Sequence, residues 1–201
     1  MESDWPEIRK HFQQGNQVAF AHVYNRFIDV LFRYGSKICA NEHLVLDAIQ
    51  EVFIDLYLRR EKIASDPAHV KYYLLLALKR NIFKKIHYNR KHSTNKISDK
   101  IYFDSKYTAD TVLLEKEDLM DNQRKISHLL KDLSSKEKEA LYLKFNESLD
   151  YPEIAQIMNI TVESVRKQVY RAIKKIRKII DIQGIVFFFT FFSKKQSNIC
   201  P

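Results

Sequence analysis

Basic side chains in this sequence gather in two segments, and both segments suit the binding of a polyanion. Between Thr161 and Lys178 there are seven basic residues and a single acid, Glu163. A second run, from Lys71 to Lys91, holds seven cations with no acid among them, and aromatic residues are interleaved with the cations. Cations neutralise phosphates and aromatic rings stack on unpaired bases, so the second run predicts contacts to single-stranded nucleic acid.

The composition of the 201-residue chain excludes several other classes of protein. Lys and Arg total 34 against 25 Asp and Glu, a formal net charge of +9, which points to nucleic acid first and to an anionic membrane surface second. The presence of only 3 Gly and 4 Pro disfavours a glycine-rich phosphate loop and an all-β sandwich, and favours long helices.

Residues with the spacing of an active site are also missing from the sequence. The two cysteines, Cys39 and Cys200, form neither a metal-ligand spacing nor a disulfide framework. No clustered carboxylates, nucleophile elbow or P-loop indicates an enzyme. We therefore expect a protein without catalytic activity, metal, cofactor or small-molecule substrate. The N-terminal MESDWPEIRK lacks the apolar stretch of a signal peptide, which predicts a cytoplasmic location.

Helices must position the second basic run. Apolar residues at spacings of three and four predict helices over residues 4–12, 16–40 and 44–59. Asp66 followed by Pro67 predicts the start of a further helix over residues 69–90. In that helix we expect Leu74, Ala77, Leu78 and part of the interleaved aromatics to lie in the core.

Residues 91–111 are polar and lack a helical apolar period, so they predict a linker. Four apolar or aromatic residues are unusual for a free linker, namely Ile101, Tyr102, Phe103 and Tyr107. They leave two alternatives open, docking on a partner or packing on the chain's own domains. Helical periodicity resumes over residues 112–133.

The first basic run lies at the end of a series of short helices. Ser134 or Ser135, with Glu137 after it, predicts a capping box and a helix whose apolar face is carried by residues 141–145. Asp150 opens a short helix over residues 151–158.

A tight turn joins that short helix to a longer basic one. Asn159 occupies the turn, where a residue that tolerates left-handed φ is needed, and Thr161 caps a final helix over residues 162–180. The packing of the two helices is assigned to Ile154, Ala155, Met158, Ile160, Val165 and Val169. Short helix, tight turn and longer basic helix together predict a helix-turn-helix.

A helical wheel separates the final helix into two faces. Val162, Val165, Val169, Ala172, Ile173 and Ile176 fall on one side. The opposite side offers hydrogen-bonding groups for base edges in its first turns and charge for phosphates in its last turns. The candidate DNA-binding residues are Thr161, Glu163, Ser164, Arg166, Lys167, Gln168, Tyr170, Arg171 and Lys174. A solvated amphipathic helix is the alternative.

Two segments together resemble one family. NITVESVRKQVYRAIKKIRK, with LSSKEKEALYLKFNESLDYPEIAQIM before it, resembles the C-terminal domain of bacterial RNA polymerase sigma factors of the extracytoplasmic-function group, with Asn159 in place of the usual turn glycine. LDAIQEVFIDLY resembles the family's D-x-x-Q-E-V-F-x-x-x-W/Y helix, which docks on the clamp helices of the polymerase's largest subunit. The matching positions are Asp47, Gln50, Glu51 and Phe53, and the resemblance covers about residues 15–180.

The resemblance implies a role for each segment. The loop over residues 60–69 and the basic, aromatic helix after it would bind the −10 element of a promoter, through Lys71, Tyr72, Tyr73, Lys79, Arg80, Lys84 and Lys85. The final helix would bind the −35 element. The implied partners are core RNA polymerase, promoter DNA and an anti-sigma factor.

The sequence thus predicts an all-α fold of two small helical domains joined by a flexible linker. The domains are residues 1–90 for polymerase docking and −10 recognition, the linker 91–111, and the helix-turn-helix domain 112–180. A stand-alone helix-turn-helix regulator is the alternative, and it leaves the Gln-Glu-Val-Phe helix unexplained.

A tail over residues 181–201 contains the apolar run 185–192, which is too short to span a bilayer, since a helix needs about 20 residues. A membrane-surface anchor, a regulator dock, a strand-prone segment and packing on the protein itself stay open.

Overall fold

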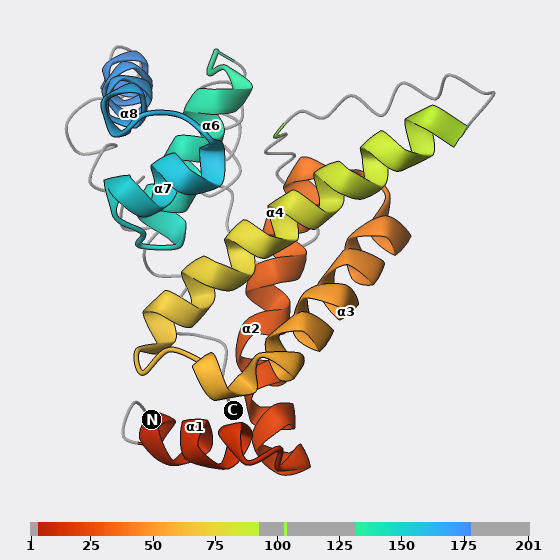
Figure 1. Ribbon diagram of the computed structural model, residues 1–201. Coiled ribbons are helices and arrows are strands. Elements are labelled where there is room, and N and C mark those ends of the chain that lie inside the picture. The colour runs from red at the N-terminus through yellow and green to blue at the C-terminus, as the bar shows by residue number, and fades with distance from the viewer. Residues whose placement is uncertain (1–3, 93–102, 104–131, 178–201) are drawn as a thin grey trace, which may run out of the picture. The chain divides into compact units, whose positions relative to one another are not determined.

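The computed structural model divides the chain into two compact units, Met1–Tyr102 and Phe103–Pro201. The structure describes residues 4–92, 103 and 132–177, and within these residues it contains helices and no strand (Figure 1). The predicted all-α class is therefore confirmed. Most of the predicted linker, most of the predicted helix 112–133, the end of the final helix after residue 177 and the tail 181–201 lie outside the described residues.

The N-terminal unit consists of four α-helices and a short 3-10 turn. They are α1 (Trp5–Gln13), α2 (Gln17–Ile38), α3 (Glu42–Leu58), the 3-10 turn η1 (Arg60–Lys62) and α4 (Pro67–His92). The four predicted helices are confirmed to within a few residues at each end. Helix α4 is longer than predicted at both ends and includes Lys91 and His92, which we assigned to the linker.

Side chains at the helix starts explain where these helices begin. The Asn16 side chain accepts hydrogen bonds from the backbone N–H groups of Val18 and Ala19, and Asn41 accepts one from that of Leu44. Ahead of α4, the Asp66 carboxylate accepts a hydrogen bond of 2.8 Å from the backbone N–H of Ala68. These bonds satisfy N–H groups that have no partner inside a helix.

Helices α2, α3 and α4 lie side by side in Figure 1, and α1 packs across the first turns of α2. Their facing sides form the core, in which Tyr34, Leu31, Ile49, Leu74, Leu75, Leu78, Ile82 and Ile86 are almost fully buried. The expectation for Leu74 and Leu78 is confirmed, whereas Ala77 is only half-buried. A methyl group on Gly35 of α2 would lie 2.6 Å from Val45 Cγ1 of α3, so glycine is what permits this close approach.

The C-terminal unit contains α6 (Ser135–Leu141), the π-helical turn η3 (Tyr142–Asn146), α7 (Tyr151–Met158) and α8 (Val162–Arg177). Both predicted starts are confirmed, because Ser134 and Asp150 each form a complete capping box with the glutamate three residues later. The apolar stretch after α6 is a π-helical turn, and Tyr142 and Leu143 in it are buried.

Phe103 belongs to the C-terminal unit although it lies in the predicted linker. Its backbone N–H donates a hydrogen bond of 2.8 Å to Ser135 Oγ, and its ring centroid lies 5.6 Å from that of Tyr142. The side chain is buried. For Phe103 the structure therefore selects packing on the chain's own domain, while Ile101, Tyr102 and Tyr107 lie outside the described residues.

Candidate nucleic-acid interface

The turn between α7 and α8 has the geometry that the sequence predicts. Asn159 adopts φ 52° and ψ 50°, the left-handed conformation that asparagine tolerates better than most residues. The Thr161 hydroxyl accepts a hydrogen bond of 3.2 Å from the backbone N–H of Ser164 and so caps α8. The chain therefore reverses within three residues and starts a new helix.

Apolar side chains fix α8 against the rest of the unit. Ile154 and Ala155 of α7 are buried, as are Val165, Val169, Ala172 and Ile176 of α8, and α8 packs on both α6 and α7. Four other residues assigned to this packing, Met158, Ile160, Val162 and Ile173, are only half-buried. The two-faced arrangement of α8 is thus confirmed for its central stripe.

All nine candidate residues of the −35 interface reach the surface of the unit. Thr161, Glu163, Arg166, Lys167, Tyr170, Arg171 and Lys174 are exposed, and Ser164 and Gln168 are half-buried. Tyr170 is 66% exposed, although tyrosine side chains are usually partly buried. Glu163, the single acid among these cations, forms an exposed ion pair of 2.7 Å with Lys167.

Arg166 shares an aromatic neighbour, Tyr151, with a second cation, Lys144. Its guanidinium carbon lies 5.6 Å from the ring centroid of Tyr151, and Lys144 Nζ lies 4.9 Å from the same ring. Lys144 also donates a hydrogen bond of 3.1 Å to the Leu149 carbonyl. Tyr151 therefore holds two cations beside the first turns of α8. Sequence reasoning missed Lys144, because no local pattern brings it to α8.

The candidate −10 residues of α4 fall into two groups. Arg80 and Lys84 are exposed, and Lys71, Tyr72 and Lys79 are half-buried, with Lys79 Nζ 5.8 Å from the Phe83 ring centroid. Tyr73 belongs to the contact between helices, because its hydroxyl donates a hydrogen bond of 2.9 Å to Asp55 of α3. Burial is the main cause that raises the pKa of Tyr73, and the hydrogen bond to the Asp55 carboxylate is the second.

Three of the four candidate polymerase-docking residues lie on the surface of α3. Asp47, Gln50 and Glu51 are exposed. Phe53 is 2% exposed, with its ring centroid 4.7 Å from that of Tyr24, so it lies in the core of the free chain, and its contact with polymerase stays a prediction. Packing against Phe20 and Tyr24 of α2 places Phe53 on the core side of α3, which the motif alone does not reveal.

An exposed apolar stripe accompanies the acidic residues of α3. Leu46, Ile54 and Leu58 are 41%, 59% and 71% exposed, and they lie on one side of the helix at multiples of four residues. Sequence reasoning missed them as surface residues. Their spacing was available, but 11 of the 17 residues of α3 are apolar, so periodicity could not say which of them face the core.

The seventh candidate −10 residue, Lys85, is paired with a side chain of α3. Its ammonium lies 2.6 Å from the Glu51 carboxylate, which also accepts a hydrogen bond of 2.7 Å from Asn81. The hydrogen bonds from Lys85 and then Asn81 lower the pKa of Glu51. A candidate polymerase contact and a candidate DNA contact are therefore paired with each other.

Two helices joined by a tight turn, with a cationic and solvent-exposed side on the second, define the class of helix-turn-helix proteins. Within residues 4–92, 103 and 132–177, no group of three or more His, Cys, Asp and Glu side chains could hold a metal ion. No helix that the structure describes is both long enough and apolar enough to cross a membrane.

Comparison with known proteins finds a family model and a relative that match this chain. Residues 123–176 match the family model of sigma-70, region 4. The ECF RNA polymerase sigma factor SigM of Bacillus subtilis (strain 168) is 25% identical over 161 residues, which are 78% of this chain and 92% of SigM. The chain is therefore similar to sigma-70 region 4 near its C-terminal end, and over most of its length to an ECF sigma factor.

Two solved structures are similar to the chain. CnrH, solved in complex with the cytosolic domain of CnrY, is 16% identical with a TM-score of 0.48, over 85% of this chain and 92% of that chain. RpoE from Bartonella quintana, solved in complex with the anti-sigma factor NepR, is 15% identical with a TM-score of 0.49, over 81% of this chain and 97% of that chain.

Proposed function

We propose that this chain is a dissociable promoter-specificity subunit, which binds core RNA polymerase and directs transcription initiation. One observation carries the proposal. The exposed side of α8 presents the nine candidate residues from Thr161 to Lys174, and this helix lies in the segment that matches sigma-70 region 4. A stand-alone regulator would also use such a helix, but it gives no reason for the sequence of α3.

The −35 element is the proposed ligand of α8. Hydrogen-bonding side chains of the first turns, such as Ser164 and Gln168, would contact base edges in the major groove. Cations of the later turns, Arg171 and Lys174, would contact phosphates. The Tyr170 ring suits apolar contact with a thymine methyl group.

The −10 element is the proposed ligand of α4. Arg80 and Lys84 are exposed cations, and Phe83 and Tyr88 are 38% and 63% exposed on the same helix. Cations for phosphates and rings for unpaired bases suit a surface that holds melted DNA. Tyr73 is assigned to the α3–α4 contact, and its proposed effect on DNA is through the position of α4.

Core polymerase is the proposed partner of α3. Asp47, Gln50 and Glu51 supply carboxylate and amide groups beside the apolar stripe of Leu46, Ile54 and Leu58. An apolar stripe flanked by acids is complementary to a basic, amphipathic surface. Phe53 would support this surface from the core.

The chain itself is proposed to catalyse no reaction, because the polymerase it joins forms the phosphodiester bonds. It would act where the polymerase acts, in the cytoplasm. An anti-sigma factor is the further partner that we propose, since members of this group are commonly held inactive by one.

Run-off transcription tests the proposal. Purified core polymerase is combined with the full chain on genomic DNA fragments, and the start sites are mapped. We expect start sites that depend on the chain, and weaker transcription from −35-dependent promoters in Arg171→Ala, which removes a proposed phosphate contact, with Arg33→Ala, exposed on α2, as the matched control. Absence of any start-site preference, with tight sequence-specific binding by the chain alone, would establish the stand-alone regulator instead.

A further inference from the structure

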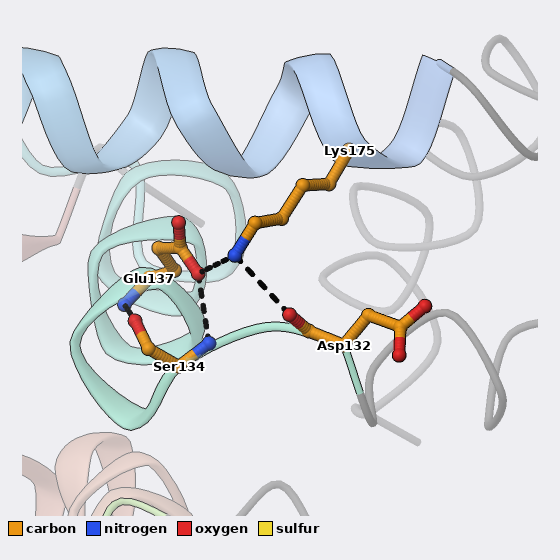
Figure 2. A network of polar contacts seen from close by, with 4 residues as sticks. All are labelled: Asp132, Ser134, Glu137 and Lys175. Carbon is orange, nitrogen blue, oxygen red and sulfur yellow. Dashed lines mark hydrogen bonds and ion pairs between the residues drawn. The ribbon is translucent and has the colours of Figure 1, made fainter.

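Lys175 is the exception among the cations of α8, because it turns away from the exposed side. Its ammonium lies 2.8 Å from Glu137 Oε2 and 3.2 Å from the carbonyl oxygen of Asp132 (Figure 2). The Lys175 side chain is 44% exposed, whereas that of Glu137 is only 4% exposed. The charge of Lys175, one of the seven basic residues counted between Thr161 and Lys178, is therefore paired within the C-terminal unit.

The partner of Lys175 is also the residue that starts α6. Glu137 Oε2 accepts a hydrogen bond of 2.7 Å from the backbone N–H of Ser134, and Ser134 Oγ accepts one of 3.3 Å from the backbone N–H of Glu137. Figure 2 shows the same carboxylate between the capping box and the Lys175 ammonium. One oxygen atom thus joins the first turn of α6 to the last turns of α8.

A buried carboxylate with these partners is a specific attachment point. Burial alone raises the pKa of Glu137, but the hydrogen bonds from Lys175 and Ser134 outweigh it and the net shift is downward. Removing one member of a buried ion pair leaves the other charge without compensation. The pair therefore adds a directional constraint to the apolar contact between α6 and α8.

Rotation of α8 matters because side chains are spread 100° apart around the helix axis. The capped turn at Thr161 fixes the beginning of α8, and the Lys175–Glu137 pair fixes its end. We propose that Lys175 and Glu137 are positioning residues, which hold the exposed side of α8 in the orientation that recognises a −35 element. The inference rests on the proposed function of α8, and it assigns to this pair a role in sequence discrimination.

The first test separates a positioning lysine from a phosphate contact. Binding of the full chain to a 30-bp duplex of random sequence is measured between about 20 and 150 mM salt, a range in which phosphate contacts determine the slope. Lys174→Met should reduce the slope of log K against log salt concentration by about 0.9, because one phosphate contact is lost. Lys175→Met, the adjacent matched variant, should leave the slope unchanged.

The second test uses a variant that keeps the net charge and the cap. Glu137→Gln with Lys175→Met replaces an ion pair by two neutral residues, and glutamine still supports a capping box. Holoenzyme made with this variant is assayed on a promoter mapped by run-off transcription and on the same promoter with a scrambled −35 element. We expect the ratio of the two activities to fall about five- to tenfold, comparable to the loss of one base contact.

This ratio distinguishes positioning from a loss of folded protein or of the proposed function. A smaller folded fraction lowers both activities equally and leaves the ratio unchanged, and the folded fraction is followed by circular dichroism. Lys175→Arg, which keeps the charge, should retain the wild-type ratio. Wild-type holoenzyme without any −35 preference would refute the function of α8 itself. A wild-type ratio in the double variant, or a slope for Lys175→Met as low as that for Lys174→Met, would overturn the positioning role.

Discussion

Glu51 of α3 and Lys85 of α4 form an ion pair with 2.6 Å between the carboxylate oxygen and the ammonium nitrogen. The Glu51 side chain is 53% exposed and that of Lys85 is 24% exposed. Pairs with this exposure contribute little to stability, typically below about 1 kcal/mol. The location of the Glu51–Lys85 pair matters more than its contribution to stability, because the pair joins the proposed polymerase-docking surface to the proposed DNA-binding surface.

Reversal of the Glu51 charge should weaken polymerase binding. In Glu51→Lys the docking surface loses a carboxylate and the new ammonium repels Lys85, so we expect at least about tenfold weaker binding of core polymerase, the loss that 1.4 kcal/mol produces. Titration of the labelled chain with core polymerase measures the affinity. Asp47→Lys changes the same surface without touching the pair and should also weaken binding, whereas unchanged affinity in both variants would rule out this docking surface.

Adjacent lysines of α4 should differ in their contribution to single-strand binding by the free chain. Lys84 is exposed, whereas the charge of Lys85 is held by Glu51. Lys84→Met should lower the salt slope for a single-stranded oligonucleotide by about 0.7, and Lys85→Met should lower it by less. Equal slopes in the two variants would mean that the pair with Glu51 does not persist when DNA binds.

Substitution of Gly35 should destabilise the N-terminal unit. In an exposed helix interior, glycine to alanine stabilises by up to about 1 kcal/mol, but a methyl group here would lie 2.6 Å from Val45 Cγ1. We therefore expect Gly35→Ala to cost about 1–3 kcal/mol through overpacking, measured by urea unfolding. Ser36→Ala, exposed on the same helix, is the control and should be nearly neutral. The sign of the change decides whether α2 and α3 approach as closely as described.

Acid should weaken the attachment of α8 to α6. The pKa of Glu137 is lowered from its ordinary value of 4.5, so its contribution to stability is complete above pH 4.5 and is lost as pH falls through the lower folded-state value. Unfolding of the wild-type chain should therefore depend more steeply on pH below 4.5 than unfolding of Glu137→Gln. Parallel pH profiles of denaturant midpoints in the two proteins would contradict this linkage.

Local patterns were enough to predict the helices and the turn of the helix-turn-helix. Neighbouring residues determine the capping at Ser134 and Asp150 and the conformation of Asn159, and the helical period determines the buried stripe of α8. These features can therefore be predicted from the sequence. Side-chain partners distant in sequence could not be predicted. Lys175 has the same charge and sequence surroundings as Lys174, and only the position of α6 shows that it points inward.

Burial on α3 and at Phe103 was unpredictable for a related reason. Most residues of α3 are apolar. A helical period of 3.6 therefore cannot decide which of two adjacent apolar residues faces the core, Phe53, which is buried, or Ile54, which is exposed. Phe103 lies in a polar stretch without periodicity, and its burial depends on Tyr142 and Ser135 of another element. Tertiary contacts decide both cases.

The stripe of Leu46, Ile54 and Leu58 has a consequence for the amount of protein that a cell can tolerate. Exposed apolar surfaces associate with one another, so copies made in excess of their binding partners would self-associate or bind other proteins non-specifically. We therefore expect the purified chain to self-associate more readily than a variant with polar residues at Leu46, Ile54 and Leu58.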